Sequence, residues 1–236
     1  MSPEEIVISM LGRYASCSTY QDSGFLENFL EGEERSQGRL LKFRTWYKKP
    51  YFFRFEWIDR PFPEAPWREN TIGCDGENAF SKYHYTGLKI QSSLKYAIAE
   101  ANAASRNAVT QISQHFPDLD LLPIAWLDRH KDLTLIGQES ANDKECYCVA
   151  ATVKNPHDKI IWVDCDDFSL RRIKTYTKVA TGISEGIMDL AKKVAPEGIE
   201  ELTAEQKKEQ RSYIETNYEE VAFDRDLPDF NFAQPE

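Results

Sequence analysis

The first residues of the chain have the pattern of an amphipathic helix. Ser2 suits an N-cap, Pro3 suits the first helical position, and Glu5 stands three residues after the cap, as a capping box requires. Apolar residues then recur at helical spacing, and the helix is expected to end near Cys17. This apolar stripe consists of Ile6, Val7, Met10, Leu11 and Tyr14.

From Thr19 to Ile58 the pattern changes to a period of two, which is typical of half-buried strands. A first strand is predicted over 20–31, and two aromatic strands then meet at a corner formed by Lys49-Pro50. One side of these two strands holds Leu41, Phe43, Thr45, Tyr47, Tyr51, Phe53, Phe55 and Trp57. The other side holds Lys42, Arg44, Trp46, Lys48, Phe52, Arg54, Glu56 and Ile58.

The chain beyond the corner continues with turns, strands and helices. The turn Asp75-Gly76 predicts a hairpin between residues 67–74 and 77–85. Apolar spacing over 92–116 predicts one kinked helix or two short ones, which Pro117 ends. Further strands are predicted over 133–140, 145–153, 159–164, 168–179 and 213–223.

The order of these elements predicts a single α+β domain over 1–236, mainly antiparallel, with about ten strands and a few helices. Residues 183–209 are charged and helix-prone, and Pro196 and Gly198 divide them. This segment is therefore predicted to be a helical insertion.

Charge limits the classes of partner. The 236 residues carry a formal charge of −10, and residues 197–236 hold twelve acidic and four basic residues. Because an acidic chain is repelled by phosphate backbones, no nucleic acid is expected as a partner. No apolar run approaches the roughly 20 residues that cross a bilayer, so no transmembrane segment is predicted.

The sequence offers little for catalysis or metal binding. Five cysteines occur without a CxxC pair and four histidines are scattered, so neither a metal site nor a cofactor is predicted. Cys74 and His84 could act as a thiol nucleophile and its base, but no oxyanion loop accompanies them. Asp164, Asp166 and Asp167 lack the glycine and distal glutamate of a calcium loop. No catalytic residue is assigned, and the chain is predicted not to be an enzyme.

Several stretches resemble the LolA/LolB-like family of bacterial lipoprotein carriers. The strand, Lys-Pro corner and aromatic strand over 41–57 are the most specific of them. The others are residues 14–24 after the first helix, the hairpin Cys74-Asp75-Gly76-Glu77, the strand pair at 161–164 and 170–173, and the ending at 218–221, 227–232 and Pro235.

The resemblance implies a curved antiparallel sheet, an incomplete barrel covered by helices, whose concave side holds acyl chains or other apolar cargo. It also implies a periplasmic location. The given chain opens Met1-Ser2-Pro3-Glu4-Glu5 without a visible signal peptide, which keeps a cytoplasmic location open. The sequence departs from the family at Lys49, where arginine is common, and at the insertion over 183–209.

Two functions follow from this pattern. The first is non-catalytic binding or carriage of a lipid, a lipoprotein acyl chain or another apolar ligand. The second is a protein-interaction module whose core is filled by its own side chains and whose acidic C-terminal segment recruits a partner. A one-residue change of register would exchange the two faces of the strands. The predicted hydrophobic cavity is lined by Leu41, Phe43, Tyr47, Tyr51, Phe53, Phe55 and Trp57, with Leu94 and Ile98 from the covering helix.

Overall fold

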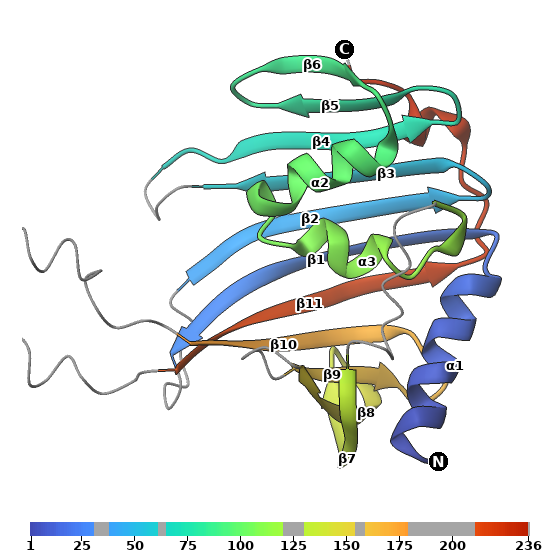
Figure 1. The fold of residues 1–236 in the computed structure, drawn as a ribbon, viewed down its shortest axis with the longest axis vertical. Helices are drawn as coiled ribbons and strands as arrows, with labels where there is room; N and C mark the ends of the chain where they lie inside the picture. Colours follow the sequence, from blue (N-terminus) through green and yellow to red (C-terminus); the bar gives the residue numbers. More distant parts are fainter. Residues whose placement is uncertain (31–37, 61–64, 120–129, 154–158, 179–210, 236) are drawn as a thin grey trace, which may run out of the picture.

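The computed structural model contains one open antiparallel sheet of eleven strands (Figure 1). The structure describes all residues except 31–37, 61–64, 120–129, 154–158, 179–210 and 236. From edge to edge the strand order is β6-β5-β4-β3-β2-β1-β11-β10-β9-β8-β7. The strands are β1 (Thr19–Leu30), β2 (Gly38–Lys48), β3 (Phe52–Asp59), β4 (Arg68–Asp75), β5 (Ala79–Tyr83), β6 (Gly87–Gln91), β7 (His130–Ala141), β8 (Lys144–Val153), β9 (Lys159–Asp164), β10 (Leu170–Lys178) and β11 (Arg211–Phe223).

The helix α1 (Pro3–Ser16) begins with the predicted capping box. The Glu5 amide donates to Ser2 Oγ at 3.2 Å, and the Ser2 amide donates to Glu5 Oε2 at 2.7 Å. Its apolar stripe is buried in the main core, as the spacing predicts. The predicted first helix is therefore confirmed.

The aromatic corner has the predicted register. Strands β2 and β3 pair from Leu41 opposite Asp59 to Lys48 opposite Phe52, and Lys49-Pro50 lies in the turn between them. Lys49 Nζ donates to the carbonyl of Ala15 at 2.8 Å, which fastens the corner to the last turn of α1. We call the sheet face that carries the odd-numbered residues of β2 and β3 the inner face and the opposite one the outer face.

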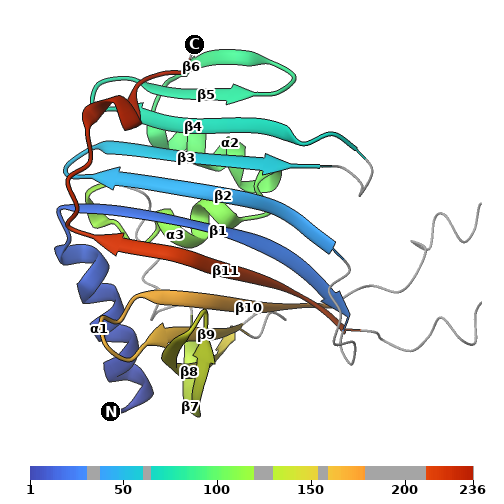
Figure 2. The same ribbon diagram turned by 180° about the vertical axis from the view of Figure 1, so that it is seen from behind.

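Helices cover the inner face of the sheet. Figures 1 and 2 show α2 (Leu94–Ala104) and α3 (Ala108–Ser113) on the same side of the sheet, with α1 across the ends of other strands. The 3₁₀ turn η1 (Pro117–Leu119) follows α3. The structure thus has two short helices, which is one of the two arrangements that the spacing predicts.

The end of the chain crosses the outer face. After β11, the tail includes the 3₁₀ turn η2 (Asp229–Phe232), which contacts β3 and β4. The Phe232 side chain is fully buried with its ring 5.4 Å from that of Phe52. Arg54 Nη1 donates to the Ala233 carbonyl at 2.7 Å. The tail is therefore part of the packed fold.

The predicted fold class, a mainly antiparallel sheet with few helices that does not close, is confirmed. The structure adds β6, which the sequence pattern missed because four of its five residues are exposed. The predicted insertion over 183–209 lies outside the described residues and stays a prediction, as does the single domain over 1–236.

Replacing Gly24 with alanine is expected to destabilise the fold by about 3 kcal/mol. A Cβ there would overlap the Asn217 carbonyl oxygen of β11 and come within 2.7 Å of Phe43 Cζ. Urea denaturation measures the effect. The matched control is Gly12→Ala in α1, where a Cβ meets open space, and it should gain about 1 kcal/mol. Equal stabilities of the two variants would contradict the close packing of β1 on β11.

Candidate functional site

The predicted cavity residues of β2 and β3 lie together on the inner face, but their side chains are packed. Six of them are at most 4% exposed, so the odd-numbered side of these strands is the buried one. We call the rings of Phe43, Phe55, Trp57 and Tyr83 the inner floor. Successive ring centroids along it are 5.8, 5.7 and 5.8 Å apart. The six packed residues are Leu41, Phe43, Tyr47, Phe53, Phe55 and Trp57.

Tyr51 does not belong to this set. It lies in the turn before β3, its side chain is 56% exposed, and it borders a surface pocket beside Phe52 and Gly76. The prediction was wrong because the alternation was extended across the Lys49-Pro50 turn, where the strand geometry is interrupted.

The helix α2 covers the β4–β6 side of the inner face with small side chains. Its buried residues are Ala97, Ile98 and Ala101, and the predicted lid residue Leu94 is half-buried against the same core. Few apolar atoms therefore hold α2, because buried alanines remove little surface from water. The helix α1 buries larger apolar side chains, so hydrophobic burial holds it more firmly than α2.

A polar contact fastens α2 to the edge of the sheet. Gln91 Nε2 donates to Glu100 Oε2 of α2 at 2.7 Å and to Ser81 Oγ of β5 at 2.7 Å. Beyond α2, Arg106 and Asn107 both adopt left-handed backbone angles, with φ of 52° and 68°. Such angles are strained for residues with side chains, so the junction before α3 stores conformational energy.

Four polar residues lie on the inner face next to the inner floor. We call Tyr20, Asp22, Thr45 and Tyr218 the polar cluster; they are at most 5% exposed and come from β1, β2 and β11. The Tyr20 hydroxyl donates to Asp22 Oδ2 at 2.7 Å. Asp22 Oδ1, Thr45 Oγ1 and the Tyr218 hydroxyl have no hydrogen-bond partner among the described residues.

Burial raises the pKa of Asp22 to about 7, since water is excluded from the charged form. Thr45, directly opposite across the β1–β2 pair, and Tyr20 offset only part of this rise. No described basic residue forms an ion pair with this carboxylate. Sequence reasoning missed Asp22, although a charged residue between Tyr20 and Gly24 on a buried parity was a signal that could have shown it.

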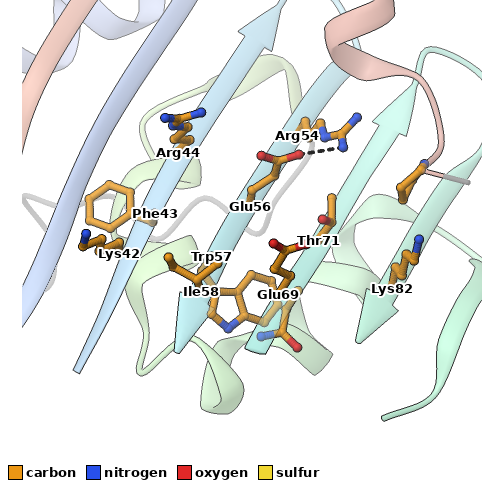
Figure 3. A pocket seen from close by; sticks show the side chains of 12 residues that line it. Lys42, Phe43, Arg44, Arg54, Glu56, Trp57, Ile58, Glu69, Thr71 and Lys82 are labelled. Carbon is orange, nitrogen blue, oxygen red and sulfur yellow. Dashed lines mark ion pairs between the residues drawn. The ribbon is translucent and has the colours of Figure 1, made fainter. Parts of the chain in front are cut away.

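A groove of about 520 Å³ lies on the outer face across β2 to β5, ending at Pro235 of the tail (Figure 3). Basic side chains come from β2, β3 and β5 and acidic ones from β3 and β4, and Arg54 Nη2 pairs with Glu56 Oε1 at 2.6 Å. Lys42 and Arg44 are exposed. Both residues belong to the side of the predicted alternation opposite the cavity residues, and the tail covers part of this face.

The candidate thiol chemistry is not assembled. The register of β4 and β5 places Cys74 opposite Ala79, whereas His84 follows the far end of β5. Burial raises the pKa of the Cys74 thiol, which disfavours the nucleophilic thiolate. Burial also raises the pKa of Cys17 to about 11. All five cysteines are free thiols.

The turn after β9 uses its aspartates structurally. Asp164 is 1% exposed and accepts from Arg171 Nε at 3.0 Å, and Asp167 Oδ1 accepts from the Ser169 amide at 2.8 Å. Aspartate side chains that accept from nearby backbone amides are common in turns. Among the described residues, no group of three His, Cys, Asp or Glu side chains could hold a metal ion.

Comparison with known proteins gives matches to solved structures only. No protein-family model matches the chain, and the search of curated proteins found no match. Lipoprotein LppX of Mycobacterium tuberculosis is 11% identical, with a TM-score of 0.45 over 96% of this chain and 97% of that one. A LolA superfamily protein from Nitrosomonas europaea is 12% identical, with a TM-score of 0.32 over 99% and 98%.

A further match is the Pseudomonas aeruginosa MucA/MucB complex, 11% identical with a TM-score of 0.40. It covers 99% of this chain but only 61% of the matched chain, so this chain spans about three fifths of its length. One of these matches is thus described as a member of the LolA superfamily, the family that the sequence resembles.

Asp22→Asn is expected to stabilise the protein at about pH 8 by roughly 2–4 kcal/mol and to have little effect at about pH 4. The folded state binds the Asp22 proton more tightly than the unfolded chain, since its pKa is raised from 3.8 to about 7. Wild-type stability therefore falls as the pH rises between these values. Urea denaturation across this range measures the difference between variant and wild type.

Asp224→Asn is a control that should lower stability at neutral pH, the opposite of the effect expected for Asp22→Asn. The amide of Ser18 and the guanidinium of Arg13 lower the pKa of Asp224, so its contribution is present at neutral pH and is lost on acidification. A pH-independent effect of Asp22→Asn would contradict the burial of a titrating carboxyl group.

Proposed function

We propose that the protein binds an apolar ligand, such as an acyl chain, on the inner face without chemical conversion of it. The observation that carries this proposal is the contrast between the inner floor and its cover. A continuous row of aromatic rings runs from β2 to β5, and the β4–β6 side of this face is covered by a helix whose buried side is mostly alanine. An alkyl chain can replace such a cover because it buries comparable apolar surface against the rings.

Binding requires α2 to move away, since the inner floor is already packed. The hydrogen bond from Gln91 to Glu100 opposes this movement, and release of the strained junction at Arg106 and Asn107 favours it. The apparent affinity then depends on the fraction of molecules in which α2 is displaced.

The remaining parts of the proposal follow the resemblance to carrier proteins. The ligand is a lipid or the acyl chain of a lipoprotein, the compartment is the periplasm, and no residue performs catalysis. Within the described residues, no helix is long and apolar enough to cross a bilayer.

A second candidate function is a protein-interaction module with a self-filled core. Full burial of the inner residues beneath α1, α2 and α3 favours it, as does the outer-face groove with its mixed charges. This function needs no displacement of α2, which separates it experimentally from the first.

Glu100→Ala is expected to tighten binding of the apolar fluorescent probe N-phenyl-1-naphthylamine about fivefold. Loss of the hydrogen bond from Gln91 and of the exposed ion pair between Lys89 Nζ and Glu100 Oε1 at 3.9 Å, together worth about 1 kcal/mol, raises the fraction of molecules with α2 displaced. The measurement is a fluorescence titration of purified wild type and variant, with native mass spectrometry to establish one bound probe per chain.

The control is Lys95→Ala, an exposed residue of α2 without an ion pair among the described residues. Its probe affinity should equal that of the wild type. Saturable probe binding with the same affinity in the wild type and in Glu100→Ala would place the site away from α2. If neither the wild type nor Glu100→Ala binds the probe, apolar-ligand binding is refuted and the self-filled interaction module is favoured.

A further inference from the structure

The inner face holds a carboxylate that the fold leaves without a counter-charge. Asp22 is 5% exposed, and only one of its oxygens, Oδ2, is paired, with the Tyr20 hydroxyl at 2.7 Å. Its other oxygen has no partner at hydrogen-bonding geometry among the described residues, and the hydroxyl and amide of Thr45 offset only part of the effect of burial. A buried carboxylate in this state is costly, and an added hydrogen-bond donor would lower that cost.

Two hydroxyl groups beside Asp22 are unpaired as well. Thr45, 0% exposed, faces it across the β1–β2 pair, and the charge of Asp22 acts on the Tyr218 hydroxyl, 1% exposed. Neither hydroxyl has a partner at hydrogen-bonding geometry within the described ranges, although Thr45 lies close enough to favour the charged form of Asp22. The three unpaired oxygens come from three neighbouring strands, which makes them one site on the inner face.

The polar cluster continues directly into the inner floor. The Tyr218 ring lies 5.5 Å from the Phe43 ring, and Phe43 begins the row that runs through Phe55 and Trp57. Gly24, between Tyr218 and Phe43 in the strand pairing, has no side chain that would separate them. A molecule with a polar end and an alkyl chain can therefore contact both regions at once.

We propose that the polar cluster binds the hydrogen-bond-donating end of an amphiphile, a hydroxyl or a primary ammonium group, while its alkyl chain lies on the inner floor. This inference rests on the proposed function and narrows its ligand class. An ionised carboxylate only accepts hydrogen bonds, and the two free hydroxyls can accept as well, so the site suits donors. A fatty-acid carboxylate would meet Asp22 as a like charge away from water and is disfavoured.

The ionisable groups around the site set the conditions of the test. Tyr14 of α1 packs on Tyr20 with ring centroids 5.3 Å apart, and His115 packs on Tyr14 at 5.1 Å. Burial raises the pKa of Tyr14, Tyr20 and Tyr218 above their usual range, so these phenols stay neutral. At about pH 8 Asp22 is the group that carries the negative charge of the site.

The experiment measures displacement of N-phenyl-1-naphthylamine by dodecylamine, dodecanol and dodecanoate at about pH 8. Wild-type protein should bind dodecylamine and dodecanol about tenfold more tightly than dodecanoate. Asp22→Asn should remove the preference for dodecylamine over dodecanoate, with each amphiphile affinity calculated from the probe affinity measured for the same variant. Asp143→Asn, which removes an equal charge from the exposed β7–β8 turn, should keep the wild-type order.

Tyr218→Phe supplies a second variant that retains the aromatic ring. It should weaken binding of dodecanol and dodecylamine about threefold to tenfold, with the probe affinity measured for the same variant as the reference, since only the hydroxyl is lost.

Equal affinities of the three amphiphiles, unchanged in both variants, would overturn the inference and leave the polar cluster to bound water, while apolar-ligand binding would stand. Absence of probe and amphiphile binding in every variant would instead refute the proposed function itself.

Discussion

An open sheet can keep its inner face from water only through the segments that lie across it. Among the described residues the sheet stays open, with β6 and β7 as its two edges, and no second sheet covers the aromatic side chains of β2 and β3. Three helices cover the inner face unequally. Tyr14 and Met10 anchor α1 deeply, whereas α2 presents alanines. Hydrophobic burial is therefore weakest at α2, where an apolar ligand could take the place of the helix.

The polar cluster is a second consequence of this arrangement. Because strands β1, β2 and β11 run through the middle of the sheet, any polar residue on their inner parity is carried into the core. Asp22 lowers stability at neutral pH, and a leucine there would be more stable. Functional sites commonly contain groups that lower stability because those groups bind a ligand. The amphiphile proposal assumes that Asp22 is such a group.

Much of this fold could be predicted from local patterns, because those patterns have local causes. The capping box at Ser2 and Glu5 fixed the start of α1, and the alternation from Leu41 to Trp57 gave the correct buried parity. The errors arose where long-range contacts decide. Tyr51 follows the alternation but lies in a turn, and β6 is ordered by pairing with β5 although its own residues are exposed. Tyr218 could not be assigned to the site, since it reaches Asp22 only through the pairing of distant β11 with β1.

The structure of the tail also assigns a different role to some of the acidic residues near the C-terminus. Twelve acidic residues over 197–236 suggested a segment that recruits a basic partner. Two of them act within the molecule: Asp224 pairs with Arg13 at 3.0 Å, and Asp229 pairs with Lys48 at 2.6 Å. These exposed pairs add little stability individually. The burial of Phe232 against Phe52 is the apolar contact that holds this part of the tail on the sheet. In the described part of the tail, the two aspartates thus contact the body of the molecule instead of forming a free acidic segment.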